Sequence, residues 1–179
     1  MPNTDIYLTV RASLFIALAI IFPMLFHMIG LGSTFLPMFL PIMLAGIFLT
    51  WKYAVTVAIL APIISYLMTG MPPIVPPVLP IMLVELGLIA LSLSLLYVHY
   101  DFTIWLALPV AIAIDRFVLW LAVVAIAPLL GFDHPLFSIG LVMSGIPGIL
   151  MQLIVIPLIL NIMRKTAPTY FIQNRNQRR

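Results

Sequence analysis

The sequence contains no cysteine and very few charged residues. The absence of cysteine excludes a disulfide framework, a thiolate metal site and a cysteine nucleophile. Only 7% of the 179 residues are Asp, Glu, Lys or Arg, whereas soluble domains carry about 25%. So few charges cannot hydrate the surface of a globular protein of this size, and the composition therefore excludes a soluble domain.

Motifs for phosphate binding and for common hydrolytic chemistry are also missing. The sequence has no Gly-x-x-x-x-Gly-Lys-Ser/Thr loop, no His-Glu-x-x-His zinc motif and no Gly-x-Ser-x-Gly nucleophile turn. It shows no inverted repeat of the kind that relates the halves of many secondary transporters. The net charge of +3 is small and its positive residues gather in the C-terminal tail, so it does not indicate a nucleic-acid partner. We predict no metal site and no cofactor.

Hydrophobic residues, by contrast, make up 64% of the chain. A helix needs about 20 apolar residues to cross a hydrocarbon core about 30 Å thick. The apolar runs are continuous rather than alternating, which excludes a transmembrane β-barrel. We predict an all-α fold, an integral membrane bundle in a single domain over residues 1–179. Its six transmembrane helices are expected at about residues 11–29, 35–50, 53–69, 78–98, 102–128 and 136–163.

The second and third of these runs are short for complete crossings of the membrane. They also contain Pro37, Pro41 and Pro62, and a proline in a membrane helix frees a backbone carbonyl that neighbouring groups must satisfy. We therefore expect one of these two helices to be kinked, tilted or only partly inserted. In the sixth run, the segment from Gly145 to Gly148 is expected to loosen the helix and to open room beside it.

The basic residues predict how the helices are oriented in the membrane. If both termini face the cytoplasm, the inner side carries seven Lys and Arg residues, and the outer loops at about 29–34, 69–77 and 129–135 carry none. This asymmetry is a strong positive-inside signal. The N-terminal run is not expected to be a removable signal peptide, because Asp5 precedes Arg11 and no Ala-x-Ala-like site follows. Both ends are predicted to be cytoplasmic, with residues 164–179 as a basic tail.

Three ionisable residues lie inside predicted membrane helices, Glu85 in the fourth and the neighbours Asp115 and Arg116 in the fifth. A charge at the centre of a membrane helix costs about 2.5–3.5 kcal/mol on insertion scales, so it normally has a partner and a purpose. One interpretation is an ion pair between helices that only fixes their packing. The other is a polar cavity for a ligand, in which Arg116 would suit a carboxylate, and Glu85 and Asp115 would suit amine or hydroxyl donors.

Three further residues are candidates for the same site. Trp120 lies one turn after Arg116 and could stack on a ring system, or it could face lipid. Gln152 is the main polar residue of the sixth helix and could line a pocket or join two helices. His27, near the outer end of the first helix, is a candidate ligand residue, although a single interfacial histidine is more often part of a protein wall.

The outer loop between the third and fourth helices is rich in proline. Residues 72–80 contain five prolines, a content that prevents a helix and favours a stiff, extended chain. Such a loop would make sense as a lid over an external cavity, and the alternative is a rigid connector of two helices. The residues predicted to form the lid are Met71, Pro72, Pro73, Pro76 and Pro77.

Several stretches of the sequence resemble the substrate-binding S components of energy-coupling-factor (ECF) vitamin transporters. They are residues 35–46, with a Pro-x-x-x-x-Gly pattern from Pro41 to Gly46, together with residues 51–54, 60–73 and 79–85. These stretches are similar to the proline–glycine region of the second helix and to the Pro and Ser/Thr-Gly region of the third helix in such proteins. The resemblance covers nearly the whole chain, with six short helices and a cytoplasmic tail.

This resemblance implies a substrate-capture subunit and not an enzyme. Such a subunit lies in the cell membrane of a bacterium or archaeon and binds a vitamin or related small molecule from outside, mainly between its last three helices. The loops after the first and third helices, here 30–34 and 69–77, would cap the site. Release would require an energising module, made of a membrane-embedded coupling (T) subunit and two ABC ATPases, and the S component is thought to topple in the membrane during that cycle.

Family members dock to this module through an Ala-x-x-x-Ala patch on the first helix, for which Ser13 and Ala17 provide a near match in this sequence. Small residues at this spacing allow another helix to approach closely. A second stripe of small residues, Gly87, Ala90 and Ser94, favours close packing of the fourth helix with a neighbour.

Two other functions would predict a different interior. A structural membrane protein resembling the rod-shape protein MreD, which is thought to share a related six-helix fold, would have a collapsed interior without a ligand-sized cavity. An intramembrane enzyme would need Glu85, Asp115 and His27 within hydrogen-bond reach of one another or of one shared substrate position.

Overall fold

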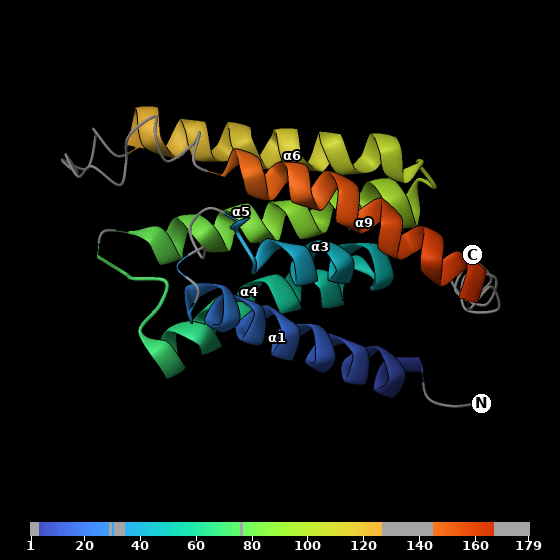
Figure 1. The fold of residues 1–179 in the computed structure, drawn as a ribbon, viewed down its shortest axis with the longest axis horizontal. Helices are drawn as coiled ribbons and strands as arrows, with labels where there is room; N and C mark the ends of the chain where they lie inside the picture. The colour runs from blue at the N-terminus through green and yellow to red at the C-terminus, as the bar shows by residue number, and fades with distance from the viewer. Residues whose placement is uncertain (1–3, 29, 31–34, 76, 127–144, 167–179) are drawn as a thin grey trace.

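The computed structural model describes residues 4–28, 30, 35–75, 77–126 and 145–166, and all regular structure in these residues is helical (Figure 1). Two of the helices continue into a short π-helical segment at their C-terminal ends, η1 after α5 and η2 after α6. The helices are α1 (Thr4–Met28), α3 (Phe39–Phe48), α4 (Trp51–Thr69), α5 (Val78–Leu93) with η1 (Ser94–His99), α6 (Ile104–Leu121) with η2 (Ala122–Ile126), and α9 (Ile146–Thr166).

Five of these helical segments are long and apolar enough to cross a membrane, namely Asp5–Met28, Trp51–Thr69, Val78–His99, Ile104–Val124 and Ile146–Thr166. The predicted all-α membrane bundle is therefore confirmed. The second predicted run, residues 35–50, contains only the ten-residue helix α3. At 1.5 Å per residue, α3 is about 15 Å long and by itself shorter than the hydrocarbon core.

Among the described residues, the largest differences from the predicted helix boundaries lie at the starts of α1 and α3, where the backbone, rather than hydrophobicity, decides. α1 extends back to Thr4, because Asp5 in its first turn lies near the positive end of the helix dipole. α3 starts at Phe39 and not at 35, because Leu36 adopts a φ of 48°, which interrupts a right-handed helix. Gly70 ends α4 with a φ of 72°, the usual glycine termination. Residues 127–128 and 136–144 of the last two predicted helices lie outside the described residues.

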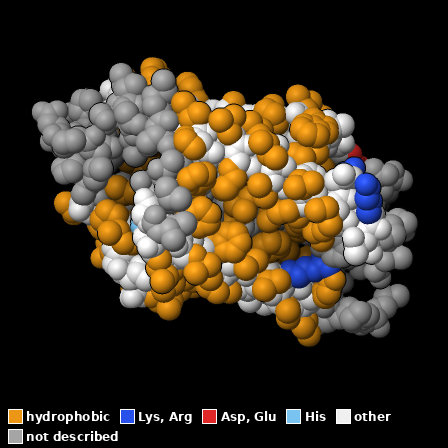
Figure 2. All heavy atoms as spheres, in the orientation of Figure 1, with side chains coloured by type: hydrophobic (Ala, Val, Ile, Leu, Met, Phe, Trp, Pro, Cys, Tyr) orange, Lys and Arg blue, Asp and Glu red, His pale blue; other side chains and the backbone are white. Residues whose placement is uncertain are grey.

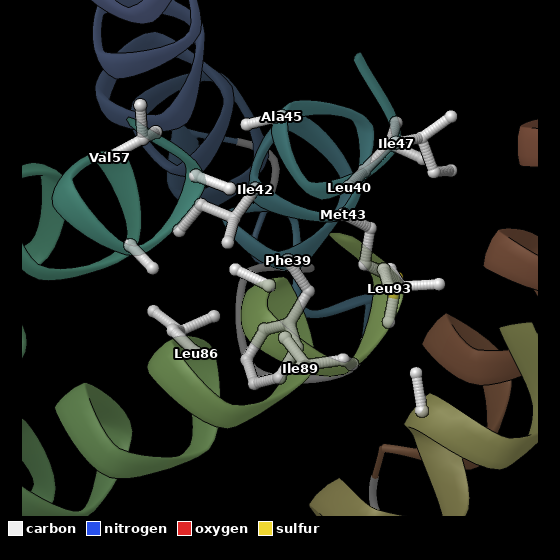
Figure 3. Packing of buried hydrophobic residues seen from close by; sticks show 14 of the residues in the cluster. Phe39, Leu40, Ile42, Met43, Ala45, Ile47, Val57, Leu86, Ile89 and Leu93 are labelled. Carbon is white, nitrogen blue, oxygen red and sulfur yellow. The ribbon is translucent and has the colours of Figure 1, made fainter. Parts of the chain in front are cut away.

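The short helix α3 forms the centre of the bundle. It packs against α1, α4 and α5, and nine of its ten residues are buried. Figure 3 shows Phe39, Ile42 and Met43 of α3 among side chains of the neighbouring helices, including Val57 of α4 and Leu86, Ile89 and Leu93 of α5. Because lipid is as apolar as these side chains, close van der Waals packing is the main force that holds α3 in place.

Small residues set the distance between α3 and α5. A Cβ atom added at Gly46 would lie 2.9 Å from the carbonyl oxygen of Ala90, so only glycine permits this approach. One turn further on, the buried Ser94 hydroxyl donates a hydrogen bond to the Leu49 carbonyl at 3.1 Å. Ala90 and Ser94 therefore serve the predicted packing role, whereas nothing lies within 4 Å of a Cβ added at Gly87.

Charged side chains of the described residues mark the end of the bundle at which α1 begins and α9 ends (Figure 1). We call this the basic end, and its Lys and Arg residues are Arg11, Lys52, Arg164 and Lys165. Figure 2 shows hydrophobic side chains over most of the visible face, with Lys and Arg only toward the basic end. At the opposite end of the bundle, α1, α4 and α6 end and α5 and α9 begin. We call this the proline-loop end, because the proline-rich loop between α4 and α5 lies there.

Candidate functional site

The polar residues of the interior come from three neighbouring helices. Glu85 lies on α5, Asp115 and Arg116 on α6, and Gln152 on α9; α6 packs against both α5 and α9. Measured along their helices at 1.5 Å per residue, all four lie about 9–17 Å from the proline-loop end. The side chains of Glu85, Asp115 and Gln152 are 6%, 2% and 1% exposed, so these polar groups are almost completely withdrawn from the surface.

Arg116 and Asp115 form an ion pair between sequence neighbours on α6. The Arg116 Nε and Nη2 groups both donate hydrogen bonds to the same oxygen, Oδ2 of Asp115, at 2.9 and 2.7 Å. Glu85 interacts electrostatically with both of these residues. We call Glu85, Asp115 and Arg116 the acid–base cluster. This pair lies within α6, so it is not the ion pair between helices of the packing interpretation, although Arg116 does have an acidic partner.

Three buried polar atoms nevertheless have no hydrogen-bond partner among the described residues. They are Oε1 of Glu85, Oδ1 of Asp115 and Nε2 of Gln152, two acceptors and one donor. Buried polar atoms in native proteins nearly always have a partner, and an unsatisfied one costs about 1–3 kcal/mol. Glu85, Asp115 and Gln152 therefore have hydrogen-bonding capacity that the described residues leave unused.

The structure adds two contacts that the sequence did not reveal. A Cβ added at Gly145 would lie 3.0 Å from Arg116 Nη1 and 2.9 Å from Leu36 Cδ1. Gly148 approaches even more closely, since its added Cβ would lie 2.6 Å from the Phe35 carbonyl oxygen. The expectation that these glycines open room beside the helix is therefore wrong: they let the start of α9 press against the segment before α3. The only signal in the sequence was the pair of glycines itself.

Trp120 and His27 are not placed with the acid–base cluster. Trp120 is 47% exposed and its ring stacks on Phe117, with 6.0 Å between ring centroids, so it lies on the outer face of α6. Trp120 follows Arg116 by four residues and therefore lies one turn away on the same helix. Its ring nevertheless points outward, which agrees with the lipid-facing alternative. His27 is exposed near the end of α1, whereas the two acids that an enzyme would have to combine with it are buried.

The proline-rich loop is tied down at both of its ends. The Met71 carbonyl accepts hydrogen bonds from Ser65 Oγ at 3.0 Å and Thr69 Oγ1 at 3.4 Å. At the other end, the Leu79 N–H donates to the Pro73 carbonyl at 2.9 Å. Met71 itself is 55% exposed, the Met71–Pro72 peptide bond is cis, and Pro72, Pro73 and Pro77 are half-buried. Pro76 lies outside the described residues. These contacts hold the loop at the end of the bundle nearest Glu85.

The predicted docking residues lie on the surface of α1. Ser13 and Ala17 are both exposed, and the Ser13 hydroxyl bonds back to the Thr9 carbonyl of its own helix at 3.0 Å. Around them, α1 presents large apolar side chains such as Ile6, Val10 and Leu14, each more than half exposed. This surface is accessible to lipid or to a partner helix.

A comparison with protein families identifies the class to which this fold and site belong. The family model described as ECF transporter, substrate-specific component, matches residues 8–163, and the chain belongs to this family. It is therefore a multi-pass membrane protein and the substrate-specific component of a transporter, as its resemblance to S components predicted. Such components are substrate-binding subunits and not enzymes, so the family favours transport over the structural and catalytic alternatives. Neither curated proteins nor solved structures yielded a match.

Proposed function

We propose that this protein captures a vitamin-like small molecule from the outer side of the membrane and passes it to an ATP-driven energising module. The observation that carries the proposal is the set of unpartnered buried atoms on Glu85, Asp115 and Gln152. A substrate that supplies these hydrogen bonds removes the free-energy cost of burying unsatisfied polar atoms, and this contributes to its binding. A protein with a purely structural interior gains nothing from keeping these atoms unsatisfied.

The position of the site supports entry from the proline-loop end. Arg11, Lys52, Arg164 and Lys165 belong to the opposite, basic end, and an excess of Lys and Arg marks the cytoplasmic side of membrane proteins. The proline-loop end would then face outward, and the loop, which Ser65 anchors through Met71, would lie on the outer side of Glu85. We propose that this loop covers the bound substrate.

Energy for release would come from other subunits. The sequence has no phosphate-binding loop of the Gly-x-x-x-x-Gly-Lys-Ser/Thr type, so ATP would be hydrolysed by two ABC ATPases joined to a coupling (T) subunit. We propose that the exposed face of α1 around Ser13 and Ala17 contacts this module, because small exposed side chains let another membrane helix approach closely.

Thermal unfolding of the purified protein with a panel of vitamins tests the capture step. We expect one compound to raise the unfolding temperature, and Glu85→Gln to weaken its binding by about 10- to 100-fold, the loss of one charge-assisted hydrogen bond. Asp101→Asn is the matched control, since it makes the same acid-to-amide change at an exposed residue near the basic end. Capture would be contradicted if no compound stabilised the protein and no small molecule co-purified with it.

The docking step is tested separately by uptake into cells. Ser13→Trp and Ala17→Trp place a large ring on the proposed contact surface, so we expect substrate affinity to be unchanged and uptake to fall to background. Leu106→Trp, at a residue 51% exposed on α6, is the control for a large ring on a different outer face. Normal uptake by both α1 variants would place the docking surface elsewhere.

A further inference from the structure

The buried charges of the site do not balance. Glu85 and Asp115 are two acids, and Arg116 is the only Lys or Arg between Tyr53 and Met163 in the whole sequence. The other basic residues of the described chain belong to the basic end. If all three groups of the acid–base cluster are ionised, one negative charge has no counterpart. Because an unpaired buried charge is very costly, that carboxylate must take up a proton or meet a positive charge from outside the chain.

The hydrogen bonds of the cluster are unbalanced in the same direction. Arg116 donates hydrogen bonds from Nε and Nη2 to Asp115 Oδ2, and its Nη1 group lies close to Gly145. The unpartnered oxygens, Oε1 of Glu85 and Oδ1 of Asp115, can only accept hydrogen bonds when the acids are ionised. What the two acids lack is therefore hydrogen-bond donors, and a donor with positive charge also balances the charge of the cluster.

An anionic substrate fits this arrangement poorly. Asp115 already holds two of the five guanidinium donors of Arg116 and balances its charge, so a carboxylate or phosphate would find an arginine that is already paired. It would also bring a second negative charge close to Glu85, and like charges in a buried site repel strongly. The two acids beside Arg116 therefore argue against the sequence-based expectation that Arg116 binds a carboxylate.

We infer that the substrate of this transporter carries a positively charged nitrogen with N–H donors, such as an ammonium, an amidinium or a protonated amino-heterocycle. Its N–H groups bond Glu85 Oε1 and Asp115 Oδ1 from two helices, and its charge completes the pairing of both acids. The third unpartnered atom, Gln152 Nε2 on α9, donates to an acceptor on the same molecule. This inference rests on the proposed capture function and specifies the chemical class of the molecule captured.

The test separates natural small molecules by charge before they meet the protein. The small-molecule fraction of yeast extract is divided at neutral pH into cation-exchange-retained, anion-exchange-retained and unretained pools, adjusted to equal ionic strength. The unfolding temperature of the unmodified full-length protein is measured with each pool. We expect the cation-retained pool to raise the unfolding temperature and the other two to leave it unchanged. Stabilisation by only the anion-retained or the unretained pool would overturn the inference but leave capture intact, whereas no stabilisation by any pool would contradict capture itself.

Two variants connect a positive result to the cluster. Glu85→Gln keeps the shape but removes one negative charge, so about 10- to 100-fold more of the cation-retained pool should be needed for equal stabilisation. Asp101→Asn should respond as the unmodified protein does. Equal responses of both variants would show that the cation binds elsewhere and would overturn the inference. Because the comparison of pools uses the unmodified protein, the test does not depend on the folding of a variant.

Discussion

Gly148 is the residue at which a single methyl group should disturb both the fold and the site. A Cβ at this position would lie 2.6 Å from the Phe35 carbonyl oxygen and 2.8 Å from its carbon, both backbone atoms. Ordinary carbon–oxygen contacts begin at about 3.3 Å, so Gly148→Ala must separate α9 from the Phe35 backbone by about 0.7 Å. Since Gln152 lies one turn further along α9, the same movement displaces a site residue.

The magnitude follows from two opposing effects. Forced overpacking costs about 1–3 kcal/mol, and replacing glycine by alanine in a helix returns about 0.5–1 kcal/mol. We therefore expect Gly148→Ala to lower the free energy of unfolding by about 0.5–2 kcal/mol and to weaken substrate binding. Gly87→Ala is the matched control, because nothing lies within 4 Å of its added Cβ, and it should be neutral or slightly stabilising.

Reversible unfolding in mixed micelles of detergent and SDS measures the stability of both variants, and thermal shift with substrate measures binding. If Gly148→Ala were as stable as Gly87→Ala and bound substrate normally, the close contact between α9 and Phe35 would not exist in the folded protein. The reasoning that α9 is positioned by this contact would then be refuted.

Two further predictions concern hydroxyl groups that hold backbone carbonyls. Ser94→Ala removes the buried 3.1 Å hydrogen bond to the Leu49 carbonyl and should lower the free energy of unfolding by about 0.5–2 kcal/mol in the same assay. The control is Thr56→Ala, which removes an exposed hydroxyl bonded within its own helix. Equal losses in the two variants would argue against a stabilising role of the Ser94 bond. Ser65→Ala removes the 3.0 Å bond to Met71 and, if the proline-rich loop is a lid, should speed substrate dissociation by about 2- to 10-fold. An unchanged dissociation rate would favour the loop as a simple connector.

The residues that pack the helices together are different from those proposed to recognise the substrate. Apolar packing around α3 and the close contacts at Gly46 and Gly148 position the helices, while recognition rests on a few polar atoms of Glu85, Asp115 and Gln152. A change in those few side chains could alter the preferred ligand without altering the bundle, because none of the glycine contacts involves their unpartnered atoms.

The sequence by itself determined that this is a helical membrane protein. Long continuous apolar runs can satisfy their backbone groups in lipid only as helices, so the helical class follows from them, whereas the shortness of α3 does not. It also indicated Glu85, Asp115 and Arg116, because a charge inside an apolar run is costly and therefore conspicuous. The resemblance to S components, carried by local proline and glycine patterns, needed no coordinates either.

Only the tertiary structure decided how the side chains are paired. Arg116 and Trp120 lie one turn apart, yet Arg116 turns to Asp115 and Trp120 turns outward onto Phe117. Likewise, the close contact of Gly148 with Phe35 joins segments more than 100 residues apart. Helical periodicity fixes the direction in which a side chain leaves its own helix, but the neighbour that it meets depends on how all the helices pack, and that information is not local in the sequence.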